Sequence, residues 1–199
     1  MICISRKHMT RTKGFTLIEL LIVIAILAIL AAVVVVVLNP GELLRQGRDS
    51  QRVADLSAVN SAISLYVTDT VPATWTVANF CTTGTTVPGS AAASCTLSAT
   101  TTVNGDGWVP INFTLISSGS PLGRLPMDPA NGSTACLGTP AICFYAFEAS
   151  STVPFGKYKI HANMESVKYA TGGTGDVESN TKDGGTENTW YEVGSDLTI

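Results

Sequence analysis

Four oxygen-bearing side chains near the carboxyl end have the spacing of a calcium-binding loop. They are Asp176, Glu178, Asn180 and Glu187. These residues take the first, third, fifth and twelfth positions of an EF-hand-like loop, and carboxylate and amide oxygens are the ligands that Ca²⁺ prefers. Position six is Thr181 instead of glycine, and no helical pattern flanks the loop. Two interpretations stay open: a looser calcium loop with Asp183 as a further ligand, or an acidic surface loop without an ion.

The cysteines beyond the long apolar segment are even in number: Cys81, Cys95, Cys136 and Cys143. Disulfides are favoured over a metal site because no Cys-x-x-Cys occurs and His161 is the only histidine in this part of the chain. Unpaired thiols are the other alternative. Three pairings are open, and the local one would close two short loops, each stabilising the fold by about 2–3 kcal/mol. Disulfides would require an oxidising compartment outside the cytoplasm.

Catalytic signatures are absent from the sequence. The chain has no His-Glu-x-x-His, no Gly-x-Ser-x-Gly and no Gly-x-x-x-x-Gly-Lys. The glycine-rich stretch 171–175 lacks a following lysine and reads as a flexible loop, and His161, inside a strand-like run, is expected to be structural. We therefore expect no enzymatic activity.

One carboxylate stands beside the most apolar part of the chain. Residues 20–38 are nineteen consecutive apolar residues, enough for a helix that crosses a bilayer and too long for an ordinary cleaved signal. Glu19 immediately precedes this run, and a carboxylate in hydrocarbon costs several kcal/mol unless it is neutralised or paired. The sequence leaves two interpretations: Glu19 reaches the membrane interface, or it has a function.

The residues around Glu19 resemble a known signal. Lys-Gly-Phe-Thr-Leu-Ile-Glu-Leu-Leu at 13–21, after a short basic leader and before a long apolar helix, resembles the class III signal of type IV prepilins and type II secretion pseudopilins. The resemblance implies that a membrane aspartyl peptidase cuts after Gly14 on the cytoplasmic side and methylates the new amino terminus of Phe15. It also implies that Glu19 meets the amine of a neighbouring subunit when the helix joins a filament.

The resemblance predicts the partners and location of the chain. The expected partners are further copies of the chain, other pilin-like subunits, the prepilin peptidase, membrane lipid and an inner-membrane assembly platform with its ATPase. The basic cluster at 6–13 would stay in the cytoplasm and the body would lie outside, first in the membrane and then in a periplasmic or extracellular filament. Major pseudopilins bind calcium in a late loop, which favours the calcium interpretation of 176–187.

Charge argues against nucleic acid as a partner. Of the 12 basic residues, four lie in the first 14 positions, which leaves 8 basic against 15 acidic side chains in the rest of the chain. Affinity for nucleic acid comes largely from Lys and Arg that neutralise phosphates. Direct binding to nucleic acid is therefore not expected.

The remaining elements suit a small α+β domain. Asn39-Pro40-Gly41 should interrupt the helix, and Pro40 should restart it. Apolar residues then recur every three or four positions, which predicts an amphipathic helix over 42–67. They are Val53, Leu56, Val59, Ile63 and Tyr66. The charged residues of this helix read either as a solvated face or as contacts between subunits: Arg45, Arg48, Asp49, Arg52 and Asp55.

Strand-like runs follow the helix. A threonine-rich stretch, 68–102, should be irregular or form short strands held by Cys81 and Cys95, and further strands are expected at 108–116, 142–148, 157–164 and 189–193. The predicted architecture is a long amino-terminal helix on a small antiparallel sheet, which resembles the pilin fold. The predicted segments are a leader at 1–14, a transmembrane and assembly helix at 15–38, and an extracytoplasmic domain at 39–199.

These observations favour a filament subunit of a type IV pilus-like or type II secretion system. The alternative is a membrane-tethered adhesin that does not polymerise, in which the threonine-rich segment would contact a surface. Replacing Glu19 would separate the two, because only the filament subunit needs that carboxylate.

Overall fold

The computed structural model describes residues 14–70, 79–83, 95–138, 141–149 and 157–199. The basic leader and the larger part of the threonine-rich stretch lie outside these residues. The chain divides into two compact units, one up to Pro40 and one from Gly41.

The amino-terminal unit is one helix, α1, from Leu17 to Leu38. Its residues are apolar on every side except at Glu19, and none of them is buried within the chain. Asn39 ends the helix in the left-handed conformation (φ 41°), which asparagine tolerates better than most residues, and α2 begins at Pro40. The predicted interruption and restart of the helix are confirmed.

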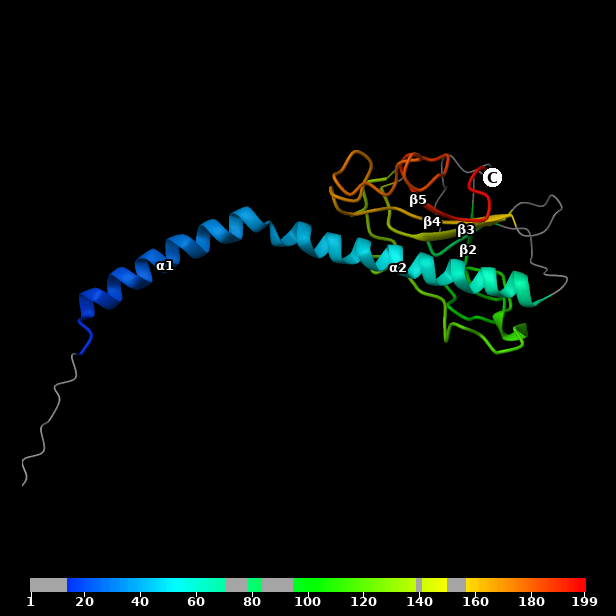
Figure 1. The fold of residues 1–199 in the computed structure, drawn as a ribbon, viewed down its shortest axis with the longest axis horizontal. Coiled ribbons are helices and arrows are strands. Elements are labelled where there is room, and N and C mark those ends of the chain that lie inside the picture. The colour runs from blue at the N-terminus through cyan, green and yellow to red at the C-terminus, as the bar shows by residue number, and fades with distance from the viewer. Residues whose placement is uncertain (1–13, 71–78, 84–94, 139–140, 150–156) are drawn as a thin grey trace, which may run out of the picture. The chain divides into compact units, whose positions relative to one another are not determined.

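The second unit has two layers, helix α2 (Pro40–Asp69) and a five-stranded sheet (Figure 1). The strands are β1 (Phe80–Cys81), β2 (Thr96–Leu97), β3 (Tyr145–Ala149), β4 (Tyr158–Ala162) and β5 (Tyr191–Gly194), in the order β2-β1-β3-β4-β5. Strands β1, β3, β4 and β5 pair antiparallel, whereas β2 pairs parallel to β1. The predicted α+β class is confirmed, with a mixed sheet.

The core lies between α2 and one face of the sheet. Leu56, Val59, Ile63 and Tyr66 of α2 are buried, as their spacing predicts, and Val53 is half-buried. Successive strand residues point to opposite faces, so alternate residues of β3 and β4 meet this helix. They are Tyr145, Phe147, Ala149, Tyr158, Ile160 and Ala162.

The predicted strand at 108–116 is wrong. The segment has an isolated bridge between Asn104 and Asn112 and a 3₁₀ helix, η1 (Phe113–Leu115), which the side chain of Asn112 caps. Pro110 lies within the run and cannot donate a ladder hydrogen bond. The apolar side chains are nevertheless fully buried and extend the core beside α2: Trp108, Val109, Ile111 and Phe113.

Candidate processing and assembly site

The bond between Gly14 and Phe15 lies in exposed chain immediately before α1. The helix begins only at Leu17, Phe15 is 77% exposed, and no heavy atom lies within 4 Å of a Cβ built on Gly14. Thr16 has extended backbone angles (φ −82°, ψ 149°). A peptidase can therefore reach this bond without unwinding the helix.

Thr16 and Glu19 form two hydrogen bonds with each other at the start of α1. Thr16 is the N-cap, and its hydroxyl accepts the backbone N–H of Glu19 at 3.3 Å. The same hydroxyl donates to Oε2 of Glu19 at 3.4 Å. The first N–H groups of a helix have no partner within the helix, so this arrangement satisfies one of them and gives the Glu19 carboxylate a local donor.

The position of Glu19 favours a carboxylate. The side chain lies in the first turn of α1, where the helix dipole presents partial positive charge. It is the only charged residue of this helix. Sequence reasoning selected Glu19 and passed over Thr16, although Thr-x-x-Glu before an apolar run is itself a capping signature.

Two charged side chains of α2 are buried inside the second unit. Asp49 and Arg52 are fully buried. Arg52 donates to both carboxylate oxygens of Asp128, at 2.7 and 2.8 Å, and to Oδ1 of Asp49 at 2.6 Å. The interpretation of these two residues as a solvated face is wrong, because their partners lie within the same domain. Asp55, half-buried, accepts the hydroxyl of Tyr145 at 2.8 Å.

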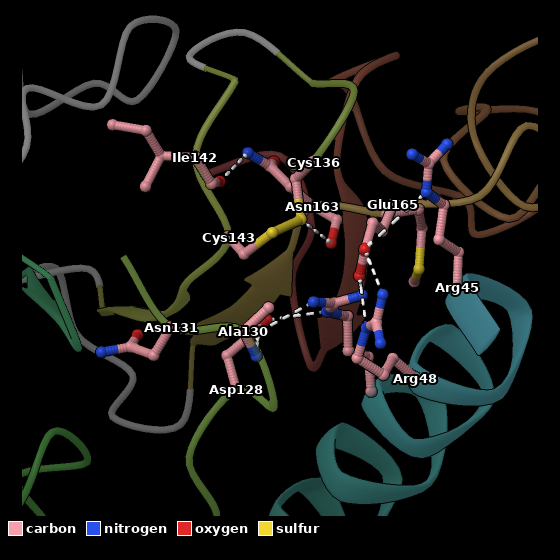
Figure 2. The surroundings of a disulfide bond; sticks show 12 residues. Arg45, Arg48, Asp128, Ala130, Asn131, Cys136, Ile142, Cys143, Asn163 and Glu165 are labelled. Atoms are coloured by element: carbon pink, nitrogen blue, oxygen red, sulfur yellow. Dashed lines mark hydrogen bonds and ion pairs between the residues drawn. A yellow bond between two sulfur atoms is a disulfide. The ribbon is translucent and has the colours of Figure 1, made fainter. Parts of the chain in front are cut away.

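Glu165 links α2 to the chain that leaves β4. Arg48 donates to its two oxygens at 2.7 and 2.5 Å, and this pairing lowers the pKa of Glu165. The backbone N–H groups of Glu165 and Ser166 donate to the buried carboxylate of Asp49 at 2.9 and 2.8 Å. Figure 2 shows Arg45 and Arg48 on either side of Glu165. Ion pairs and backbone hydrogen bonds thus fix residues 165 and 166 to α2.

Both disulfides of the local pairing are present. Cys81 of β1 is bonded to Cys95, next to β2, and Cys136 is bonded to Cys143. The loop that the second bond closes lies beside Asn163, whose side-chain amide donates to the carbonyl of Ile142 at 2.7 Å (Figure 2). The first bond therefore joins β1 to the residue that precedes β2, and the second joins two residues that lie before β3.

Two of the predicted calcium ligands, Asp176 and Asp183, accept hydrogen bonds from backbone N–H groups. Asp176 accepts the N–H groups of Gly172, Glu178 and Ser179, and Asp183 accepts those of Gly185 and Glu192. Among the described residues, no group of three or more Asp, Glu, His or Cys side chains converges to hold a metal ion. The choice between a calcium loop and an ion-free acidic loop at 176–187 stays a prediction.

The other three predicted ligands, Asn180, Glu187 and Glu178, have different surroundings. Asn180 is exposed, and the backbone N–H of Glu187 donates to Glu192 at 3.1 Å. Glu178 is buried and accepts N–H groups from Met164 and Thr171, at 2.5 and 3.2 Å. Burial raises its pKa to about 8.

His161 lies in an aromatic cluster on the sheet face away from α2. Its ring stacks on Trp190, with centroids 4.5 Å apart, and meets Phe144 edge-on. Complete burial, together with the charge of Lys159, lowers its pKa to about 3. The imidazole is therefore neutral near pH 7, and the stacking gives it a structural role.

A comparison with known protein families finds a match in the amino-terminal part of the chain. Residues 9–35 match the family described as the prokaryotic N-terminal methylation motif. The chain carries a prepilin-type signal. Its match covers Gly14, Phe15, Thr16, Glu19 and the greater part of α1. No curated protein and no solved structure matches the chain.

The prepilin-type signal agrees with the physical character of α1. This helix is long and apolar enough to cross a membrane, and it is the one such helix among the described residues. The signal and the helix together fit a membrane-anchored precursor of the type IV pilin or pseudopilin kind, with a structural character.

Proposed function

We propose that the protein is a structural subunit of a type IV pilus-like or type II secretion pseudopilus filament. The prepilin peptidase would cut after Gly14 and methylate Phe15, and α1 would then enter the filament core. The observation that supports the proposal is the family match over residues 9–35, which includes the exposed Phe15 and the hydrogen-bonded Thr16 and Glu19.

Cleavage would create the partner that Glu19 needs. The new amine of Phe15 lies four residues before the carboxylate of Glu19, and unlike charges in a low-dielectric medium lower each other's burial cost. In a filament the carboxylate would meet the amine of a neighbouring subunit. An ion pair of this kind would fix the axial register of each added subunit.

The surroundings of α1 explain why a polar pair matters. Lipid tails are as apolar as leucine, so moving α1 from bilayer to helical bundle gains little hydrophobic free energy. Close packing and polar contacts must then favour the bundle. Glu19 is the only acidic or basic side chain that α1 can contribute.

The filament role needs the body outside the cytoplasm. The two disulfides support this orientation, because such bonds persist in oxidising compartments. Further copies of the chain, other pilin-like subunits and an assembly platform with its ATPase would be the partners of the processed subunit.

Replacing Glu19 tests the filament role against a membrane tether. In the native host, Glu19→Ala should abolish filaments while the chain is still cut after Gly14 and stays in the membrane. Glu42→Ala is the matched control, because Glu42 lies beyond α1, and it should leave filaments intact. Filaments of normal number and length from Glu19→Ala would contradict the proposal and favour the non-polymerising adhesin.

A further inference from the structure

Exposed apolar side chains gather where α2 enters the second unit. Leu43 and Leu44 are 52% and 66% exposed. Segment 164–169 lies against the same end of the helix, because the backbone N–H of Lys168 donates to Oε1 of Glu42 at 3.4 Å. Val167, 64% exposed, is part of that segment. We call Leu43, Leu44, Arg45, Val167 and Lys168 the first-turn surface.

The contacts of Glu165 keep this surface in place. Its carboxylate is held by Arg48, and its backbone N–H by the buried Asp49. Val167 follows two residues later and therefore cannot move far from the beginning of α2. In Figure 1 the chain that follows β4, drawn in orange, lies over the early turns of α2. The first-turn surface is thus a fixed feature of the second unit.

Chain length keeps the first-turn surface close to the bilayer. The 22 residues of α1 extend about 33 Å, which matches a hydrocarbon core of about 30 Å. Leu43 follows Leu38 by five residues, which extend at most about 18 Å. The head-group layer adds about 5–7 Å on each side of the core. Leu43 and Leu44 are therefore within reach of that layer in a membrane-anchored chain.

The exposed charge of this surface is positive, although the chain as a whole is acidic. The side chain of Arg45 is 47% exposed, and Lys168 is exposed with its Nζ 5.1 Å from the ring centre of Tyr169. The nearby acids are less exposed: the side chains of Glu42 and Glu165 are 17% and 3% exposed, and their carboxylates lie 3.8 and 4.0 Å from the guanidinium of Arg45. Lys and Arg beside a membrane are attracted to anionic phospholipids.

We propose that the first-turn surface rests on an anionic bilayer before the subunit is assembled. Leu43, Leu44 and Val167 enter the head-group layer, and Arg45 and Lys168 bind the phosphates of anionic phospholipids. The proposal rests on the membrane-anchored state of the proposed function, and adds that the folded domain itself binds lipid. Extraction into a filament must then break these contacts as well as remove α1 from the bilayer.

Photo-crosslinking of the full chain in nanodiscs tests this contact. A p-benzoylphenylalanine replaces Val167 in one variant and Leu115 in another. Leu115 is the matched control, because it is 58% exposed and lies near Asp69, at the other end of α2. In bilayers that contain phosphatidylglycerol, position 167 should give at least about fivefold more phospholipid adduct than position 115, measured by mass spectrometry.

A charge variant tests the anionic preference separately. Lys168→Gln should lower the phosphatidylglycerol-dependent adduct at position 167 about fivefold, the factor that one basic residue contributes near an anionic surface. Lys182→Gln removes another exposed lysine and should leave the adduct unchanged. Equal responses of the two lysine variants would contradict the assignment of Lys168.

A probe within α1 distinguishes failure of this proposal from failure of the proposed function. With p-benzoylphenylalanine at Ile26, lipid adducts must form in every bilayer if α1 spans it. Adducts at position 26 with equally low yields at 167 and 115 would overturn the lipid contact alone. Crosslinks from 167 to a second copy of the chain would also overturn it, and assign the surface to subunit contacts. No adduct at position 26 would overturn the membrane anchor itself.

Discussion

Arg52 and Asp128 form a fully buried two-point ion pair between helix α2 and the irregular segment between η1 and β3. The guanidinium Nε and one terminal nitrogen of Arg52 donate to the two oxygens of Asp128, at 2.7 and 2.8 Å. Buried charges must be paired and hydrogen-bonded, and the third donor of Arg52 reaches Asp49. The pair therefore fixes the helix against residues that are 76 positions away.

Breaking this pair should destabilise the domain strongly. In Asp128→Asn, Arg52 keeps its charge in a buried site and loses the two-point pair among its three carboxylate partners, which are Asp128, Asp49 and Glu165. We expect the free energy of unfolding to fall by about 3–5 kcal/mol. Chemical denaturation of the full chain in detergent micelles would measure the loss. Asp106→Asn, at an exposed aspartate, should change the value by less than about 0.5 kcal/mol, and an equal effect of the two changes would contradict a special role for the buried pair.

Glu178 should make the domain less stable in alkali. Burial raises the pKa of its carboxyl from 4.5 to about 8, so the fold favours the neutral acid. Its contribution to stability is complete below pH 4.5 and is lost as the pH rises through about 8. We expect the melting temperature to fall over this range.

The matched variant for that prediction is Glu178→Gln, which cannot ionise. It should melt lower than the natural protein at acidic pH, because its amide nitrogen cannot accept one of the two backbone N–H groups that the carboxyl accepts. It should also lack the alkaline decline assigned to Glu178. A decline of the same size in both proteins would show that another group is responsible.

The hydroxyl of Thr16 should stabilise the first turn of α1. Thr16→Val keeps the shape of the side chain and removes both hydrogen bonds with Glu19. This loss should destabilise the first turn of α1 by about 1 kcal/mol. Amide exchange of Leu17 to Leu20 in micelles should quicken, and the yield of filaments should fall. Thr16→Ser retains the hydroxyl and should behave like the natural protein. Unchanged exchange in the valine variant would contradict the capping role.

The local patterns of the sequence predicted much of the fold. The spacing of Leu56, Val59, Ile63 and Tyr66 indicated the buried side of α2, and strand-like runs indicated β3, β4 and β5 within a few residues. The restart of the helix at Pro40 followed from local chemistry as well. Each of these signals depends on residues close together in the chain.

Features that depend on distant partners could not be predicted in this way. Asp49 and Arg52 resembled solvated helix residues because their partners, Asp128 and the backbone of Glu165, lie 76 and 116 residues away. The run that contains Pro110 has the composition of a strand, yet its side chains enter the core from an irregular segment. The spacing of the loop carboxylates could not show that Asp176 and Asp183 accept nearby backbone N–H groups.

More of the amino-terminal site than of the globular domain could be predicted from the sequence, because a peptidase recognises a signal of contiguous residues. Gly14, Phe15 and Glu19 were selected from the sequence, and the family match covers all three. The sequence did not show the pairing of Glu19 with Thr16, which depends on where α1 begins. Processing at this site is the central claim of the proposed function.

Mass spectrometry of the amino terminus tests that claim most directly. The protein would be extracted from native membranes, and its intact mass and amino-terminal peptide would be measured. We expect a chain that begins at Phe15 and carries a methyl group on its amine. A chain that still begins at Met1, or one that begins between Ala28 and Val33 after ordinary signal cleavage, would contradict the account and remove the proposed role of Glu19.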